Sequence, residues 1–382
     1  MLFKKLIRTM GLYKAQFISM IIMIALGVGI FVGFNMEWVS IEKNTDAFYE
    51  ETGFADYRIK SEQGFSSEEL KKIENISGVE KASRYLAVNA DIKEKSGDAI
   101  ALTVTENGEV SGVQLISGEK YDKNSTDGIW LSDKYASANG FKLGDKITVK
   151  YKNLEIECKI KGLVKSSEYL ICVRDSSQLM PDYKTFGFGY ISPALYKKAA
   201  GNDFYPQINV ISKLSKKEFT EKSDNALGKT TLILTKDEVG SYSSARGEAD
   251  EGKTMGSVLP VLFLLIAVLT MVTTMHRLTA KEKTQIGTLK ALGFKDKRIL
   301  FHYTSYALMI GVVGSALGVL LGYGVAYAIM NPDGMMGTYF DMKKWVLYLP
   351  WFCTVAVILI IVLLTFIGFL SVKQMLKGTA AD

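Results

Sequence analysis

Residues 247 to 254 read GEADEGKT, which fits the G-x-x-x-x-G-K-[ST] pattern of a phosphate-binding loop. In such a loop free backbone N–H groups surround the phosphates, so a strand must precede the loop and a helix must follow it. The upstream residues, VGSYSSAR, show no strand pattern, and three carboxylates would stand where phosphates bind, at Glu248, Asp250 and Glu251. We interpret GEADEGKT as a chance match in a polar helix or linker.

The segment 39–256 holds few side chains suited to catalysis. Both histidines, His276 and His302, lie outside it, which excludes histidine-based triads and most zinc sites. Cys158 and Cys172 lack CxxC spacing; they could form one disulfide across neighbouring strands or be ordinary half-buried residues. Cys353 lies in an apolar stretch and is interpreted as a packing residue. We predict no catalytic residue, no cofactor, no metal site and no enzymatic activity.

Four apolar stretches dominate the organisation of the 382 residues, of which 48% are hydrophobic and 23% charged. Apart from Glu37 at the rim of the first, none of them contains Asp, Glu, Lys or Arg. About 20 helical residues span the ~30 Å hydrocarbon layer. We therefore predict a membrane protein with four transmembrane helices, at 17–38, 257–275, 301–330 and 345–370.

The basic residues between these stretches predict the orientation of the chain. Residues 1–16 carry four Lys or Arg and no acid, residues 276–300 carry seven against Glu282 and Asp296, and the tail 371–382 carries two against Asp382. The positive-inside rule makes these segments cytoplasmic in a multi-pass cell-membrane protein with both termini inside. The net charge of +6 then reflects this segregation and indicates no nucleic-acid partner.

The first apolar stretch follows a basic leader, as in a secretory signal, but it is too long and no A-x-A site ends it. We interpret it as a retained anchor. Residues 1–16 read as an interfacial helix on the inner leaflet, because apolar residues recur at helical spacing among the basic ones, at Leu2, Phe3, Leu6, Ile7 and Met10.

The pattern of residues 39–256 predicts an extracytoplasmic α+β domain between the first two membrane helices. A helix continues outward from the first span, and a less regular helix returns to the second. Ser66 and Glu69 have capping-box spacing for one further helix, and two more are predicted at 192–200 and 215–226. Strands are predicted at 55–60, 84–92, 99–105, 145–151, 154–164, 168–174, 205–212 and 230–235, those within 128–174 forming a possible separate β-rich subdomain. A short outer loop at 331–344 separates the last two spans.

Glycines four residues apart mark one face of the first and third spans. Such faces let a second backbone approach closely in lipid. The alternative is glycine that a membrane helix merely tolerates. We predict helix packing at Gly29, Gly33, Gly311, Gly314, Gly318 and Gly322.

The loop RLTAKEKTQIGTLKALGFKDKRIL at 277–300 is basic and amphipathic. We predict an interfacial helix, a turn at Gly293 and a helix entering the membrane, with one apolar face formed by Ile286, Leu289, Leu292 and Phe294. Periodicity alone also fits a plain membrane-surface helix.

Residues 285–293, QIGTLKALG, closely resemble the cytoplasmic signature of the FtsX/MacB-type ABC-transporter permeases, Arg-Glu-Ile-Gly-x-x-Arg/Lys-Ala-Leu-Gly, with Gln285 in place of the Glu. The order of spans agrees, and the stretch from IWLSDKYASANGFKLGDKITV to IKGLV is similar to the β-rich part of the MacB outer domain. The sequence of residues 285–293 is most similar to the first half of the long duplicated FtsX-like permeases.

The resemblance implies a permease subunit that pairs with a second permease half or a second copy and contacts membrane lipids. A separate ABC ATPase subunit would dock under the loop and move the outer domain, for export or mechanotransmission. An extracytoplasmic substrate or a cell-wall hydrolase would be the outer partner. A membrane-anchored sensor of extracellular peptide or antibiotic, or a regulator of hydrolases without transport, is the alternative. The ATPase-docking residues are predicted to be Gln285, Ile286, Gly287, Leu289, Lys290, Ala291, Leu292, Gly293 and Phe294.

Overall fold

The computed structural model describes residues 8–175 and 177–378. The chain divides into two compact units. The helical unit comprises the described parts of 1–41, 248–330 and 346–382, and the sheet unit comprises those of 42–247 and 331–345. Much of the predicted interfacial helix, including Leu2, Phe3, Leu6 and Ile7, lies outside the described residues.

In the helical unit the apolar stretches form four helices long and apolar enough to cross a membrane, counted over the described residues. They are α2 (Lys14–Thr52), α7 (Gly240–Lys281), α9 (Asp296–Met330) and α11 (Trp351–Gly378). The short helix α8 (Lys283–Ala291) joins α7 to α9. The helix α7 is continuous from Gly240, so the prediction of a less regular returning helix is wrong. Contacts with α2 support the helix despite its glycines: Gly252 packs on Trp38, and Asn35 Nδ2 donates to the Gly256 carbonyl at 3.0 Å.

Glycines form the close contact between α2 and α9 within the helical unit. A Cβ added at Gly314, Gly318 or Gly322 would lie 2.9, 2.6 or 2.7 Å from the Cβ of Ile24, Val28 or Val32. In the other direction, Gly29 and Gly33 of α2 receive Leu321 and Val325 of α9. Gly311 instead faces Ile361 of α11 at 3.8 Å. The glycine faces thus meet each other inside one chain.

The sheet unit contains a ten-stranded sheet built from described residues, in the order β10-β1-β9-β2-β3-β8-β5-β7-β4, with β6 paired to β2 and β7. Most pairs are antiparallel; β3 with β8 and β5 with β7 are parallel. The strands are β1 (Tyr57–Lys60), β2 (Val79–Ile92), β3 (Ala99–Thr105), β4 (Gln114–Gly118), β5 (Gly128–Ser132), β6 (Lys146–Tyr151), β7 (Leu154–Lys165), β8 (Phe186–Ile191), β9 (Gln207–Ser212) and β10 (Leu232–Thr235).

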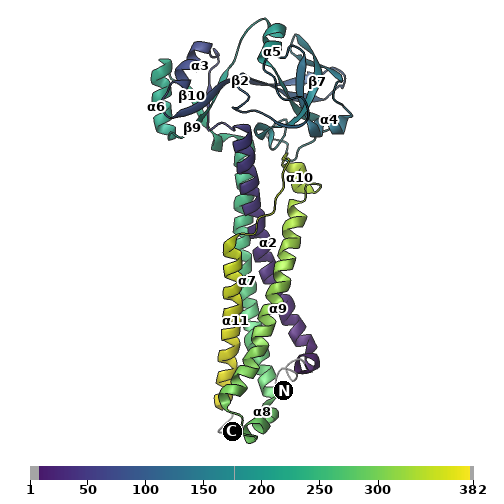
Figure 1. Ribbon diagram of the computed structural model, residues 1–382, viewed down its shortest axis with the longest axis vertical. Coiled ribbons are helices and arrows are strands. Elements are labelled where there is room, and N and C mark those ends of the chain that lie inside the picture. Colours follow the sequence, from purple (N-terminus) through teal and green to yellow (C-terminus); the bar gives the residue numbers. More distant parts are fainter. Residues whose placement is uncertain (1–7, 176, 379–382) are drawn as a thin grey trace. The chain divides into compact units, whose positions relative to one another are not determined.

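Helices pack on this sheet at both of its ends (Figure 1). α3 (Ser67–Glu74) and α6 (Lys216–Leu227) lie together beside β9 and β10, around the buried rings of Tyr57 and Phe219. The expected capping box of α3 forms, with Glu69 N donating to Ser66 Oγ at 3.2 Å and Ser66 N donating to Glu69 Oε2 at 2.8 Å. The remaining short helices are α4 (Asp133–Asn139), α5 (Pro193–Ala200) and α10 (Met335–Tyr339).

The predicted fold class is confirmed, with four apolar helices and an α+β domain between the first and second. A separate β-rich subdomain near 128–174 is wrong, because the 14-residue strand β2 pairs with β9 along its first half and with β3 and β6 further on, which joins all strands into one sheet. The strand at 168–174 is also wrong. That segment begins with the 3-10 turn η1 (Ser167–Tyr169), and Leu170, Ile171 and Cys172 are buried consecutively by tertiary packing.

The proposed disulfide does not form. Cys158 and Cys172 are both free and buried. They belong to different hydrophobic clusters: Cys158 packs with Ile147 and Val149, whereas Cys172 packs with Trp130 and Phe188. Burial raises the pKa of the Cys158 thiol to about 12, so the thiolate needed for disulfide exchange is scarce at neutral pH.

Replacing Gly318 with Leu should lower the melting temperature of the full chain in detergent, because the new side chain would overlap Val28. Overpacking of this kind costs about 1–3 kcal/mol or more. Gly324→Leu is the matched control, since no described atom lies within 4 Å of a Cβ at that position of the same helix. Equal melting temperatures for the two variants would show that the glycine contact contributes nothing.

Candidate functional site

The segment GEADEGKT does not have the geometry of a phosphate-binding loop. All eight residues lie inside α7, so their N–H groups take part in the helix. The ammonium of Lys253 lies 5.6 Å from the centre of the Trp38 ring, and Gly252 packs on the same tryptophan, whose Cβ would be 3.1 Å from an added Cβ. Among the described residues no group of three or more His, Cys, Asp or Glu could hold a metal ion.

The helix α8 rests on the ends of α7 and α9 through one apolar face. Ile286 is 2% exposed and shares a cluster with Leu278 of α7 and with Ile299 and Tyr303 of α9. Glu282, between α7 and α8, is buried and accepts a hydrogen bond from Tyr303 Oη at 3.1 Å. These contacts mean that α8 cannot shift without disturbing both long helices.

A tight turn ends α8 and starts α9. Gly293 has φ +83°; its N–H donates to the Lys290 carbonyl, and the N–H of Phe294 donates to the Leu289 carbonyl, both at 3.0 Å. This is a Schellman motif, in which the residue after the glycine packs back on the helix. Accordingly Leu289 and Phe294 are half-buried against the core.

The predicted apolar face is wrong at Leu292. It is 70% exposed, because the turn at Gly293 directs Phe294 onto the core in its place. It lies with Gln285, Gly287 and Ala291 among the exposed residues of the loop, and no described atom lies within 4 Å of a Cβ at Gly287. We call Gln285, Gly287, Thr288, Ala291 and Leu292 the exposed face of α8.

Cations surround the exposed face of α8. Lys290 and Asp296 form an ion pair of 3.2 Å across the turn. The other charged residues nearby are exposed and basic: Lys281, Lys283, Lys295, Lys297 and Arg298. The predicted docking residues therefore have different environments: Gln285, Gly287, Ala291, Leu292 and Gly293 are exposed, Lys290 is paired with Asp296, and Ile286, Leu289 and Phe294 pack on the core.

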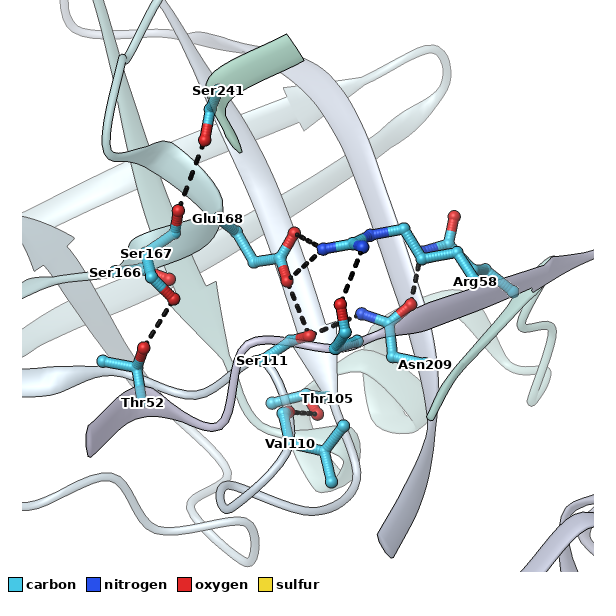
Figure 2. Close-up of polar contacts among 12 residues, drawn as sticks. Thr52, Arg58, Thr105, Val110, Ser111, Ser166, Ser167, Glu168, Asn209 and Ser241 are labelled. Carbon is cyan, nitrogen blue, oxygen red and sulfur yellow. Dashed lines mark hydrogen bonds and ion pairs between the residues drawn. The ribbon is translucent and has the colours of Figure 1, made fainter. Parts of the chain in front are cut away.

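A second feature, in the sheet unit, is a buried polar network around η1 (Figure 2). Arg58 and Glu168, with side chains 5% and 8% exposed, form a bidentate ion pair in which Arg58 Nη2 donates to both carboxylate oxygens at 2.9 Å. Ser111 Oγ donates to Glu168 Oε1 at 2.7 Å, and Asn209 Nδ2 donates to Ser111 Oγ at 2.6 Å. The network thereby joins β1, β9, η1 and the loop before β4.

The same turn holds the ends of the helices that enter the sheet unit. Thr52 Oγ1, in the last turn of α2, is hydrogen-bonded to Ser167 Oγ at 2.5 Å, and Ser241 Oγ, in the first turn of α7, donates to the Ser167 carbonyl at 3.4 Å. The carbonyls of Thr52 and Gly53 accept from the N–H groups of Gly112 and Ser111, at 2.8 and 2.7 Å. These bonds satisfy carbonyl groups that a helix C-terminus leaves without partners. We call Thr52, Arg58, Ser111, Ser167, Glu168, Asn209 and Ser241 the helix anchor.

Comparison with known proteins finds similarity to membrane permeases. Residues 257–380 match the model of the family described as FtsX-like permease C-terminal. The uncharacterized ABC transporter permease MJ1507 of Methanocaldococcus jannaschii is 24% identical over 317 residues, covering 74% of this chain and 70% of that protein.

Two solved structures are similar to about half of this chain. The extracellular domain of the noncanonic ABC-type transporter YknZ from Gram-positive bacteria has 11% identity and a TM-score of 0.35, covering 47% of this chain and 98% of that one. The periplasmic region of MacB from Actinobacillus actinomycetemcomitans has 12% identity and a TM-score of 0.34, covering 55% and 97%.

The four helices and the domain inserted after the first define a multi-pass membrane protein. The match of residues 257–380 and the relative from M. jannaschii confirm the resemblance predicted from residues 285–293: this part of the chain is similar to the FtsX-like permeases. The helix anchor was not predicted. Its members lie far apart in the sequence, 110 residues for Arg58 and Glu168 and 115 for Thr52 and Ser167, and nothing in the local pattern marks Arg58 or Glu168 as buried.

Replacing Arg58 with Met should destabilise the full chain by about 3–5 kcal/mol, because Glu168 would stay buried without its countercharge. Thermal unfolding in detergent measures the effect. Lys81→Met is the control, since it breaks an exposed pair with Glu109, 47% and 70% exposed, and water screens such a pair so that it contributes little to stability. Similar unfolding of the two variants would contradict a structural role for the Arg58–Glu168 pair.

Proposed function

We propose that this chain is the membrane subunit of an ABC transporter in which a separate ATPase subunit docks on the exposed face of α8. ATP binding and hydrolysis by that subunit move the domain formed by residues 39–256, for export or mechanotransmission. The observation that carries the proposal is the division of α8 into a buried face on α7 and α9 and an open, small-residue face with Leu292 70% exposed. Exposed apolar residues within a polar rim are typical of protein interfaces.

The proposal assigns sides of the cell membrane to the segments. Residues 1–16, 276–300 and 371–382 are cytoplasmic, and residues 39–256 and 331–344 are outside, with spans at 17–38, 257–275, 301–330 and 345–370. The distribution of basic residues supports this orientation. In this orientation the open face of α8 lies on the side where ATP is available.

A chain of packed contacts supports the transmission of movement from α8. Ile286 couples α8 to α7 and α9, and the glycine contacts couple α9 to α2. Helices α2 and α7 both continue into residues of the sheet unit, α2 up to Thr52 and α7 from Gly240. There the helix anchor bonds both of them to the turn η1.

The remaining partners follow from the apolar surface of the helical unit. α7 exposes a row of large apolar residues, Val258, Val261, Leu262, Leu265 and Leu269. In a membrane such a row contacts lipid or another helix. We propose that it contacts lipids and a second copy of the chain or a second permease half, and that a substrate or hydrolase binds the outer domain.

Single cysteines test the orientation. Gly287→Cys and Lys120→Cys introduce exposed thiols, whereas the three native cysteines are buried. A membrane-impermeant maleimide should label position 120 in intact cells and position 287 only after permeabilisation. Labelling of 287 but not 120 in intact cells would invert the orientation and overturn the proposed function.

Gly287→Glu and Leu292→Glu should each weaken co-purification of a cognate ABC ATPase at least tenfold, because a carboxylate would enter a contact surface of small and apolar residues. Gly247→Glu is the matched control: it is also a helical glycine with no described atom within 4 Å of its Cβ, but it lies in the proposed outer part. Unchanged ATPase recovery in the α8 variants would refute the docking site. Recovery of no ATPase even by the unmodified chain would favour a sensor.

A further inference from the structure

The connection between α9 and α11 is part of the sheet unit. Residues 331–345 group with residues 42–247. Tyr183 Oη donates to the Thr338 carbonyl at 3.2 Å, and Asp341 N donates to the Leu170 carbonyl at 2.7 Å. The loop thus packs on the segment between η1 and β8, far from it in sequence.

Two lysines of the sheet unit reach the loop. Lys134 of α4 donates to the carbonyls of Gly337 and Phe340, and its ammonium lies 4.9 Å from the centre of the Tyr183 ring. Lys165, at the end of β7, pairs with Asp341 and, at 2.8 Å, with Asp133. Phe340 is fully buried beside them.

The centre of this contact is a buried ion pair. The side chain of Asp341 is 0% exposed and that of Lys165 is 7% exposed. Burial raises the pKa of Asp341, although Lys165 and Lys134 oppose this. Burial alone would lower the pKa of Lys165, but Asp341 and Asp133 raise it overall, so Lys165 remains the positive partner.

Stability alone does not account for this pair. Asp341 Oδ2 is buried and has no hydrogen-bond partner among the described residues. A buried carboxylate with one unsatisfied oxygen is a poor source of stability, and well-packed apolar residues in place of a buried ion pair are often as stable or more so. What a charged pair adds is one defined register between the two segments it joins.

We propose that residues 331–345 form a clasp, locked by Lys165 and Asp341, that makes the ends of α9 and α11 follow the sheet unit. The clasp gives the sheet unit a second connection to the membrane helices, besides α2 and α7. Movement of α9, which starts directly after the turn that ends α8, then reaches the sheet unit through its own loop. This role in transmission rests on the proposed function, whereas the clasp itself does not.

Hydrogen exchange of the full chain in lipid nanodiscs, without any ATPase, tests the clasp. Lys165→Met should lower the melting temperature by about 5 °C or more, because Asp341 loses its main countercharge. The double variant K165M/D341L should regain most of that loss and yet exchange amide protons in 331–345 at least tenfold faster than the unmodified chain. Unchanged protection of the loop in the double variant would overturn the proposal.

A matched control separates the clasp from charge removal in general. K213M/E80L removes an exposed pair in the same unit, 88% and 46% exposed, and should leave both the melting temperature and exchange in 331–345 unchanged. Faster loop exchange in this control, equal to that of K165M/D341L, would contradict a specific lock.

The role in transmission has a separate readout in the complex with the ATPase. K165M/D341L leaves α8 intact, so ATPase recovery should be normal, while an ATP-dependent fluorescence change from a dye on Lys120→Cys should fall at least twofold. If K165M/D341L shows faster exchange in 331–345 but an unchanged fluorescence response, the clasp has a structural role and none in transmission. If the unmodified chain binds no ATPase, the proposed function is refuted. The hydrogen-exchange result, which needs no ATPase, would still test the clasp.

Discussion

The close contact between α2 and α9 is the interaction on which the rest of the structure depends. In lipid no hydrophobic force draws two apolar helices together, so they need surfaces that allow tight van der Waals packing. Gly314, Gly318 and Gly322 provide that surface for Ile24, Val28 and Val32. Along the chain, α9 follows α8 and precedes the loop 331–345, so the helix that packs on α2 is also the one that continues into both proposed elements.

Buried ion pairs occur in the sheet unit at segments that continue into the membrane helices. Arg58 and Glu168 lie beside the ends of α2 and α7, and Lys165 and Asp341 hold the loop that links α9 to α11. A charge inside a protein is tolerated only with its partner in good geometry, so such a pair resists sliding more than an apolar contact does. Both pairs therefore fix the register of the segments that they join.

The sequence predicted the elements with strong local patterns. The charge-free stretches, the capping box at Ser66, the strand at 99–105 and the turn at Gly293 all follow from interactions within a few residues, and the structure contains them. The incorrect expectations concern burial that distant parts of the chain impose. Leu292 is exposed because Phe294 takes its place on the core, residues 168–174 are buried without being a strand, and the strands of 128–174 join a common sheet.

Hydrophobicity and the QIGTLKALG signature were enough to predict four helices that could cross a membrane and a resemblance to the FtsX-like permeases, because both signals depend on local sequence. The tertiary structure alone decided which residues form buried ion pairs between distant segments. Arg58 meets Glu168 across 110 positions and Lys165 meets Asp341 across 176, and before folding each of them is one among many exposed charges. Only the folded chain removes water from these pairs, and that desolvation makes their partners and their geometry matter.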